Sequence, residues 1–159
     1  MRKFIHGYYR LLNVLLGVSV GLLIVPVTLQ IISRYTALIP SWILTEEASR
    51  FLFIWMVMLG AMIGVREGTH FEVDVWPTLS PRATAALHVV SSLAVLVFAL
   101  VFVWAGFQFT RFAWNRLSEL AELPLWLIHM AWPLAGITWI LFMGERMADD
   151  LRVLRSDAG

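Results

Sequence analysis

The chain has 159 residues, of which 60% are hydrophobic and 14% are charged, and its formal net charge at pH 7 is +1. This composition excludes an ordinary soluble domain, and the small net charge gives no sign of a nucleic-acid partner. The absence of cysteine excludes disulfides, thiol catalysis and thiolate metal sites.

Three long segments contain no Asp, Glu, Lys or Arg, and they cover 11–33, 83–110 and 123–144. Each exceeds the roughly 20 residues that a helix needs to cross a bilayer. A fourth helix is expected around the shorter uncharged run 51–65. The sequence therefore predicts an all-α integral membrane protein, with one domain over 1–159 and four transmembrane helices over 9–34, 42–67, 81–112 and 124–148.

The basic residues predict the orientation of these helices. Four spans place both termini on one side of the membrane. The N-terminal segment, the middle loop and the tail hold about twice as many Lys and Arg residues as the other two loops, so both termini are expected in the cytoplasm. The N-terminal apolar run is too long for a signal peptide and is expected to remain as the first helix.

The first predicted helix contains polar and small residues that could contact other helices. Asn13 and Gln30 are expected to form interhelical hydrogen bonds rather than to bind a ligand. Gly17-x-x-x-Gly21 has the spacing of small residues that lets two helix backbones approach closely. Pro26 should bend the helix locally.

The second predicted helix begins with charged residues, which are costly at a membrane unless they are paired or face protein or water. Glu46 and Arg50 are i,i+4 neighbours in the favourable order. We expect Glu46, Glu47 and Arg50 to act in assembly. The alternative is that their side chains only extend to the membrane surface.

Two faces of the second helix can be distinguished by their residues. Gly60-x-x-x-Gly64 lies on the face of the ion pair and is expected to pack against the glycines of the first helix. The opposite face suits lipid or a second protein and is expected to contact a partner subunit; it carries Phe51, Trp55, Met58 and Met62.

The loop after the second helix mixes charged and apolar residues. His70, Glu72 and Asp74 have an i, i+2, i+4 spacing that could suggest a metal site, but a solvated loop or short strand fits it equally well, and no metal is expected. Phe71 and Trp76 among them indicate a short amphipathic segment in the plane of the membrane between the second and third helices.

The outer loop before the fourth helix is amphipathic and is a plausible docking surface for another protein. It spans about 111–122 and includes Trp114 and Arg116. Pro124 and Trp126 begin the fourth helix, and Pro133 and Gly136 interrupt it.

No motif for chemistry of its own is found in the chain. His88 and His129 lie toward opposite membrane faces, about 10 Å or more apart in depth, so they cannot ligate one haem iron. The first helix lacks the embedded carboxylate that a small multidrug exporter needs. No phosphate-binding loop, nucleophile elbow or zinc signature is present, and the chain is expected to be a subunit rather than an enzyme.

Several short motifs together resemble one family over essentially the whole chain. They are Glu46-Glu47-x-x-Arg50, Trp55, Gly60-Ala61, Arg66, His70, Asp74, Pro124-x-Trp126 and Pro133-x-x-Gly136. Their order and spacing resemble the small membrane subunit (DctQ type) of tripartite ATP-independent periplasmic (TRAP) transporters. The segment 111–123 is the least typical of that family.

This resemblance implies a subunit of a secondary transporter in the bacterial inner membrane. In such a system a periplasmic binding protein captures an organic anion, often a carboxylate, and a large membrane subunit carries the substrate and sodium sites. The small subunit enlarges the scaffold and helps to receive the binding protein. No cofactor is expected on this chain, although it contacts membrane lipids and its surroundings allow a bound phospholipid. The alternative is a membrane anchor for a redox or other enzyme complex without transport.

Overall fold

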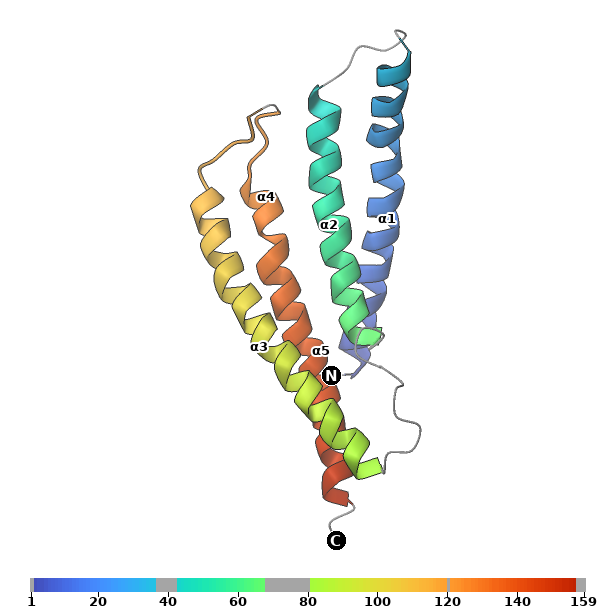
Figure 1. Cartoon of the computed structure of the whole chain (residues 1–159), viewed down its shortest axis with the longest axis vertical. Helices are drawn as coiled ribbons and strands as arrows, with labels where there is room; N and C mark the ends of the chain where they lie inside the picture. Colours follow the sequence, from blue (N-terminus) through green and yellow to red (C-terminus); the bar gives the residue numbers. More distant parts are fainter. Residues whose placement is uncertain (1, 37–42, 68–80, 120, 157–159) are drawn as a thin grey trace.

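The structure, a computed structural model, describes residues 2–36, 43–67, 81–119 and 121–156. Four stretches in these ranges are long and apolar enough to cross a membrane. The prediction of an all-α membrane protein with four spans is therefore confirmed. Figure 1 shows the helices, which are α1 (Arg2–Tyr35), α2 (Ile43–Glu67), α3 (Pro81–Ala113), α4 (Trp126–His129) and α5 (Ala131–Ser156).

Two helices extend beyond the ranges expected from the sequence. α1 begins at Arg2 rather than near residue 9, and α5 continues to Ser156 rather than ending near residue 148. Both extensions contain Lys, Arg, Met or Leu, which favour helix whether or not they lie in a bilayer. The expected in-plane segment, with His70 and Asp74, lies outside the described residues.

The fourth span is interrupted near its start. α4 ends at His129 and α5 begins at Ala131, with Met130 between them. Pro133 has no N–H to donate to the carbonyl of His129, four residues earlier, so one helical hydrogen bond is missing there. The chain nevertheless continues in the same direction, and α4 and α5 together form one span.

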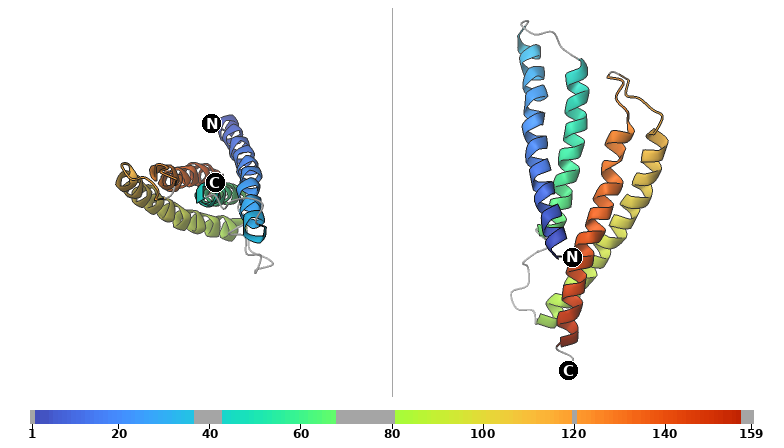
Figure 2. Two further views of the ribbon diagram at one scale, coloured as in Figure 1. Left: turned by 90° about the horizontal axis from the view of Figure 1, so that it is seen from above. Right: turned by 180° about the vertical axis from the view of Figure 1, so that it is seen from behind.

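The helices form two antiparallel hairpins. α1 packs on α2, α3 packs on α4 and α5, and α2 joins the hairpins by its contacts with α4 and α5. Figure 1 and Figure 2 show the hairpins converging at one end and diverging at the other. The start of α1 and the end of α5 lie at the converging end. Which membrane side this end faces stays a prediction.

The core lies between α2 and the α3–α5 hairpin, with two side chains from the start of α1. It consists of Ile5, Leu12, Leu59, Met62, Ile63, Val65, Val95, Ala99, Ala135, Trp139, Phe142 and Met143. Trp139 links three helices, because its ring lies 4.8 Å from that of Phe102 and its Nε1–H donates to the carbonyl of Ala61 at 3.1 Å. This polar contact fixes the register of α5 against α2.

The closest helix approach occurs at glycines of α3 and α5. A Cβ added to Gly136 would lie 2.7 Å from the carbonyl oxygen of Ala99, and one added to Gly106 would lie 2.6 Å from Cδ of Pro133. The expected contact between Gly60 and the glycines of α1 is wrong, because an added Cβ at Gly60, Gly17 or Gly21 meets nothing within 4 Å. Gly64 is buried within the chain.

Candidate partner-binding face and the contacts that fix it

The ion pair at the start of α2 lies on an exposed face of this chain. Arg50 Nη2 is 3.8 Å from Glu46 Oε1, and the two side chains are 59% and 66% exposed. Phe53 and Val57 continue this face toward Gly60, and both are exposed. The glycine pattern on this face predicted packing against α1, which would partly bury the pair. In the structure the pair is instead exposed. We call Glu46, Arg50, Phe53, Val57 and Gly60 the open face of α2.

The opposite face of α2 is used inside the chain, which corrects the expected partner contact. Met62 is only 2% exposed and belongs to the core. Trp55 donates from Nε1 to the carbonyl of Leu127 at 3.0 Å and so holds α2 against α4. Met58 packs against the core, and Phe51 lines a small apolar cavity between α1 and α2. These side chains position α2 and leave its other face outward.

Glu47 fixes the diverging end of α2 to the loop between α3 and α4. Its side chain is 4% exposed, and Oε2 accepts a hydrogen bond from the backbone N–H of Ala121. A carboxylate in such a buried place requires donors, and the loop backbone supplies one. Glu47 therefore acts within the subunit by tying two hairpins together, whereas Glu46, one residue earlier, faces outward.

The loop held by Glu47 is a tight turn rather than an open segment. Ser118 N–H donates to the carbonyl of Leu123 at 2.8 Å, and Leu123 N–H donates to Ser118 Oγ at 3.0 Å. A bridge pairs Leu117 with Pro124, and Glu122 has φ of 54°, in the left-handed region that most residues avoid. The backbone thus fixes the exposed side chains at this end.

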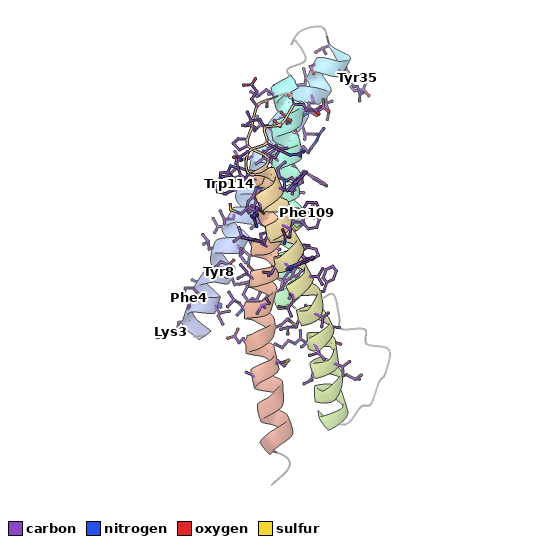
Figure 3. All side chains as sticks on the ribbon, turned by 90° about the vertical axis from the view of Figure 1, so that its left-hand side faces the viewer. Lys3, Phe4, Tyr8, Tyr35, Phe109 and Trp114 are labelled. Atoms are coloured by element: carbon purple, nitrogen blue, oxygen red, sulfur yellow. The ribbon has the colours of Figure 1, made fainter. Side chains whose placement is uncertain are left out.

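Aromatic side chains mark the same end of the bundle. The rings of Trp114 and Trp126 lie 5.4 Å apart, and Arg116 lies over the ring of Phe112 at 3.8 Å. Figure 3 shows Trp114 and Phe109 near this end of α3. Tryptophan is enriched at the membrane–water boundary, so we expect this end of the bundle near that boundary. Of the family-motif residues here, Pro124 forms the bridge and Trp126 the ring contact.

Arg66 joins three helices at the converging end. Its Nη1 lies 3.2 Å from Glu145 Oε2, and both side chains are mostly buried. The guanidinium carbon is 5.2 Å from the centre of the Tyr9 ring and 5.1 Å from that of Phe142. The hydroxyl of Tyr9 also donates to Glu67 Oε1 at 2.6 Å. Sequence reasoning selected Arg66 but missed Glu145, because nothing local relates two residues 79 positions apart.

Several polar side chains within the spans form contacts between or within helices. Gln30 Nε2 donates to the Thr45 carbonyl at 2.8 Å and to Ser49 Oγ at 2.7 Å, which confirms its predicted interhelical role. Asn13 bonds to the Tyr9 carbonyl of its own helix, so that prediction is wrong.

Two further polar side chains, on α5 and on α4, bond to carbonyls of their own segment. Thr138 donates to the Leu134 carbonyl at 2.8 Å and lies 2.8 Å from the Tyr8 hydroxyl. His129 Nδ1 lies 2.8 Å from the Leu125 carbonyl, to which it must donate because a carbonyl only accepts. In the described part of the chain, no three His, Asp or Glu side chains come close enough to hold a metal ion.

Comparison with known proteins yields one consistent result. Residues 23–153 match the family described as tripartite ATP-independent periplasmic transporters, DctQ component. The chain is 30% identical to a TRAP transporter small permease protein of Haemophilus influenzae, over 86% of this chain and 85% of that one. It is 26% identical to the sialic acid TRAP transporter small permease protein SiaQ of Vibrio cholerae, over 97% and 87% of the two chains.

A third relative matches a shorter part of the chain, and its name gives a different substrate. The C4-dicarboxylate TRAP transporter small permease protein DctQ of Rhodobacter capsulatus is 28% identical over 57% of this chain and 41% of its own length.

Proposed function

This chain belongs to the DctQ component family of TRAP transporters and is a small permease subunit of that kind, and we propose that it works by widening the fixed part of a three-component importer. Its partners are a large membrane subunit and a periplasmic substrate-binding protein. The substrate is an organic anion that carries a carboxylate group, and a sodium gradient drives its uptake across the bacterial inner membrane. Both termini face the cytoplasm, and the chain has no catalytic chemistry of its own.

One observation carries this proposal: several polar side chains within the described spans bond to other groups of this chain. Thr138, Gln30 and His129 each bond to a backbone carbonyl. A transport site at the membrane midplane needs several polar groups or broken helix ends that converge on one substrate. The cluster of charged side chains that does form among the described residues, around Arg66 and Glu145, lies at the converging end of the bundle, which supports placing the substrate and sodium sites on the large subunit.

The substrate class is supported by the relatives rather than by residues of this chain. Two relatives are named for C4-dicarboxylates and for sialic acid. Both kinds of molecule carry carboxylate groups. Because this chain presents no substrate site, its own residues do not select among such anions.

Co-purification tests the proposed role against that of an enzyme anchor. The tagged chain should be isolated from membranes of its own cells, and its companions should be identified by mass spectrometry. We expect a large multi-span TRAP subunit in the purified complex and no haem absorbance band. A redox enzyme as the main companion, together with such a band, would contradict the proposal.

The open face of α2 is proposed as the contact with the large subunit, and Gly17 and Gly21 of α1 remain available for assembly as well. Gly60 leaves space for a neighbouring backbone, because an added Cβ there meets nothing within 4 Å. A charged pair exposed at the start of a membrane helix is better stabilised if another protein covers it than if lipid does.

Arg50→Ala is expected to lower the yield of assembled complex several-fold while changing the stability of the isolated chain little. An exposed pair such as Glu46–Arg50 contributes at most about 1 kcal/mol by itself, but an unpartnered charge inside an interface costs more. Yield is measured by size-exclusion chromatography of the co-expressed subunits.

Arg10→Ala is the control, because it removes an exposed arginine that lies outside both the open face of α2 and the 111–122 loop. It should assemble normally. If Arg50→Ala also assembles normally but uptake by the complex loses its sodium dependence, then the role of Arg50 lies in ion coupling and the assembly assignment is wrong.

A further inference from the structure

An open cavity of about 770 Å³ lies where α1, α2 and α5 meet at the converging end of the bundle. It is lined by Lys3, His6, Arg66, Glu67, Phe142, Met143, Glu145 and Arg146. The proposed transport role uses none of these side chains to bind a ligand. Figure 3 shows Lys3 at the start of α1.

The cavity wall carries an excess of positive charge. Three of its residues are cationic and two are carboxylates, with His6 beside them. Arg66 Nη1 lies 3.2 Å from Glu145 Oε2, and Glu67 accepts a hydrogen bond from the Tyr9 hydroxyl. Among the described residues, Lys3 forms no ion pair or hydrogen bond. Within the described part of the chain, no carboxylate therefore neutralises its ammonium group, which can pair with an added anion.

The cavity lies at the level where we expect the boundary between membrane and water. Three candidate spans begin or end beside it, because they run over Lys3–Tyr35, Leu44–Glu67 and Trp126–Ala148. Phe142 and Met143, each 3% exposed, form an apolar part of its wall. The cavity thus presents cations at the level of lipid headgroups and an apolar surface next to them.

We propose that this cavity binds an anionic phospholipid, with the headgroup phosphate near Lys3 and the start of an acyl chain against the Phe142 and Met143 side. Basic pockets between membrane helices bind such headgroups, and each basic residue contributes to their attraction. A free phosphate ion would gain less, because it meets the same carboxylates but has no acyl chain to place against the apolar part of the wall. The site does not depend on the proposed transport role.

The test uses the full-length chain purified in a neutral detergent. Thermal unfolding is measured with added phosphatidylglycerol, with phosphatidylcholine of the same acyl chains, and with inorganic phosphate, and native mass spectrometry counts the retained lipid. We expect phosphatidylglycerol to raise the unfolding temperature most and to remain bound as one molecule. Lys3→Gln should weaken its apparent affinity about fivefold, as expected for loss of one basic residue at a membrane surface.

Arg10→Gln is the matched control, because it removes a charge from the same N-terminal segment but does not line the cavity. It should bind phosphatidylglycerol as the unmodified chain does, and Lys3→Arg should retain most of the affinity. Equal effects of the two lipids, or of inorganic phosphate alone, would overturn the proposal.

Two further results would also overturn it. One is an equal loss of affinity in Arg10→Gln and Lys3→Gln, which would place the lipid elsewhere on the basic segment. The other is a lipid preference that is absent once the large subunit is bound, which would assign the cavity to an acidic segment of that partner. Neither result would affect the assignment of the chain as a transporter subunit.

Discussion

Gly136→Ala is expected to destabilise the folded chain by about 1–3 kcal/mol, although alanine normally favours helix over glycine by about 0.5–1 kcal/mol. The added Cβ would lie 2.7 Å from the Ala99 carbonyl oxygen and 2.9 Å from the Val103 backbone nitrogen. Backbone atoms cannot move aside as a flexible side chain does, so α3 and α5 must separate. Thermal and denaturant unfolding of the purified chain in detergent measure this loss.

Gly144→Ala provides the control on the same helix. No atom lies within 4 Å of a Cβ added at Gly144, so only the helix preference changes and stability should stay the same or rise slightly. Opposite signs for the two variants would support the close contact between α3 and α5. Equal effects would show that this contact does not determine the packing of the hairpin.

Arg66→Met is expected to lower the free energy of unfolding by about 2–4 kcal/mol. This range overlaps the one for breaking a fully buried ion pair and begins slightly below it, because the Arg66–Glu145 pair is mostly, not fully, buried. The methionine keeps much of the apolar stem but leaves Glu145 without its partner in a mostly buried place. It also removes the cation from between the rings of Tyr9 and Phe142. Unfolding of the purified single variant measures the total loss.

A double-mutant cycle separates the charge from the packing. Arg66→Met combined with Glu145→Met removes both charges, so the double variant should be clearly more stable than Arg66→Met alone. Glu145→Gln is a milder partner variant that keeps the side-chain shape. If the effects of the two single substitutions simply add, then the Arg66–Glu145 pair does not link α2 to α5 energetically.

The number of spans could be predicted from the sequence because the bilayer imposes a simple rule. A helix that crosses lipid must be long and nearly free of charge, and the runs 11–33, 83–110 and 123–144 meet this condition. The break between α4 and α5 also followed from a local cause, since Pro133 lacks an N–H. Such features depend on one segment at a time.

The faces of α2 could not be assigned in the same way. In a membrane, lipid-facing and protein-facing side chains are equally apolar, so hydrophobicity does not distinguish Phe53 from Met62. One is exposed in this chain and the other is in the core. Glycine spacing was equally ambiguous: Gly17, Gly21 and Gly60 have open space beside them, whereas Gly136 meets a backbone.

The adjacent carboxylates at the start of α2 illustrate what only the tertiary structure decides. Glu46 and Glu47 were expected to act together in assembly. Neighbouring residues on a helix point about 100° apart, so Glu46 lies on the open face while Glu47 reaches the loop after α3. The position of Ala121, which supplies the N–H, depends on a turn that lies 74 residues further along the chain.

The most direct test of the proposed role is uptake by reconstituted vesicles under an inward sodium gradient. Vesicles would contain this chain alone, the large subunit with the binding protein, or all three components. We predict uptake of the organic anion only with all three, because we assign the substrate and sodium sites to the large subunit and propose that this chain supplies the scaffold that the large subunit needs. Uptake by this chain alone, or uptake at full rate without it, would contradict the account.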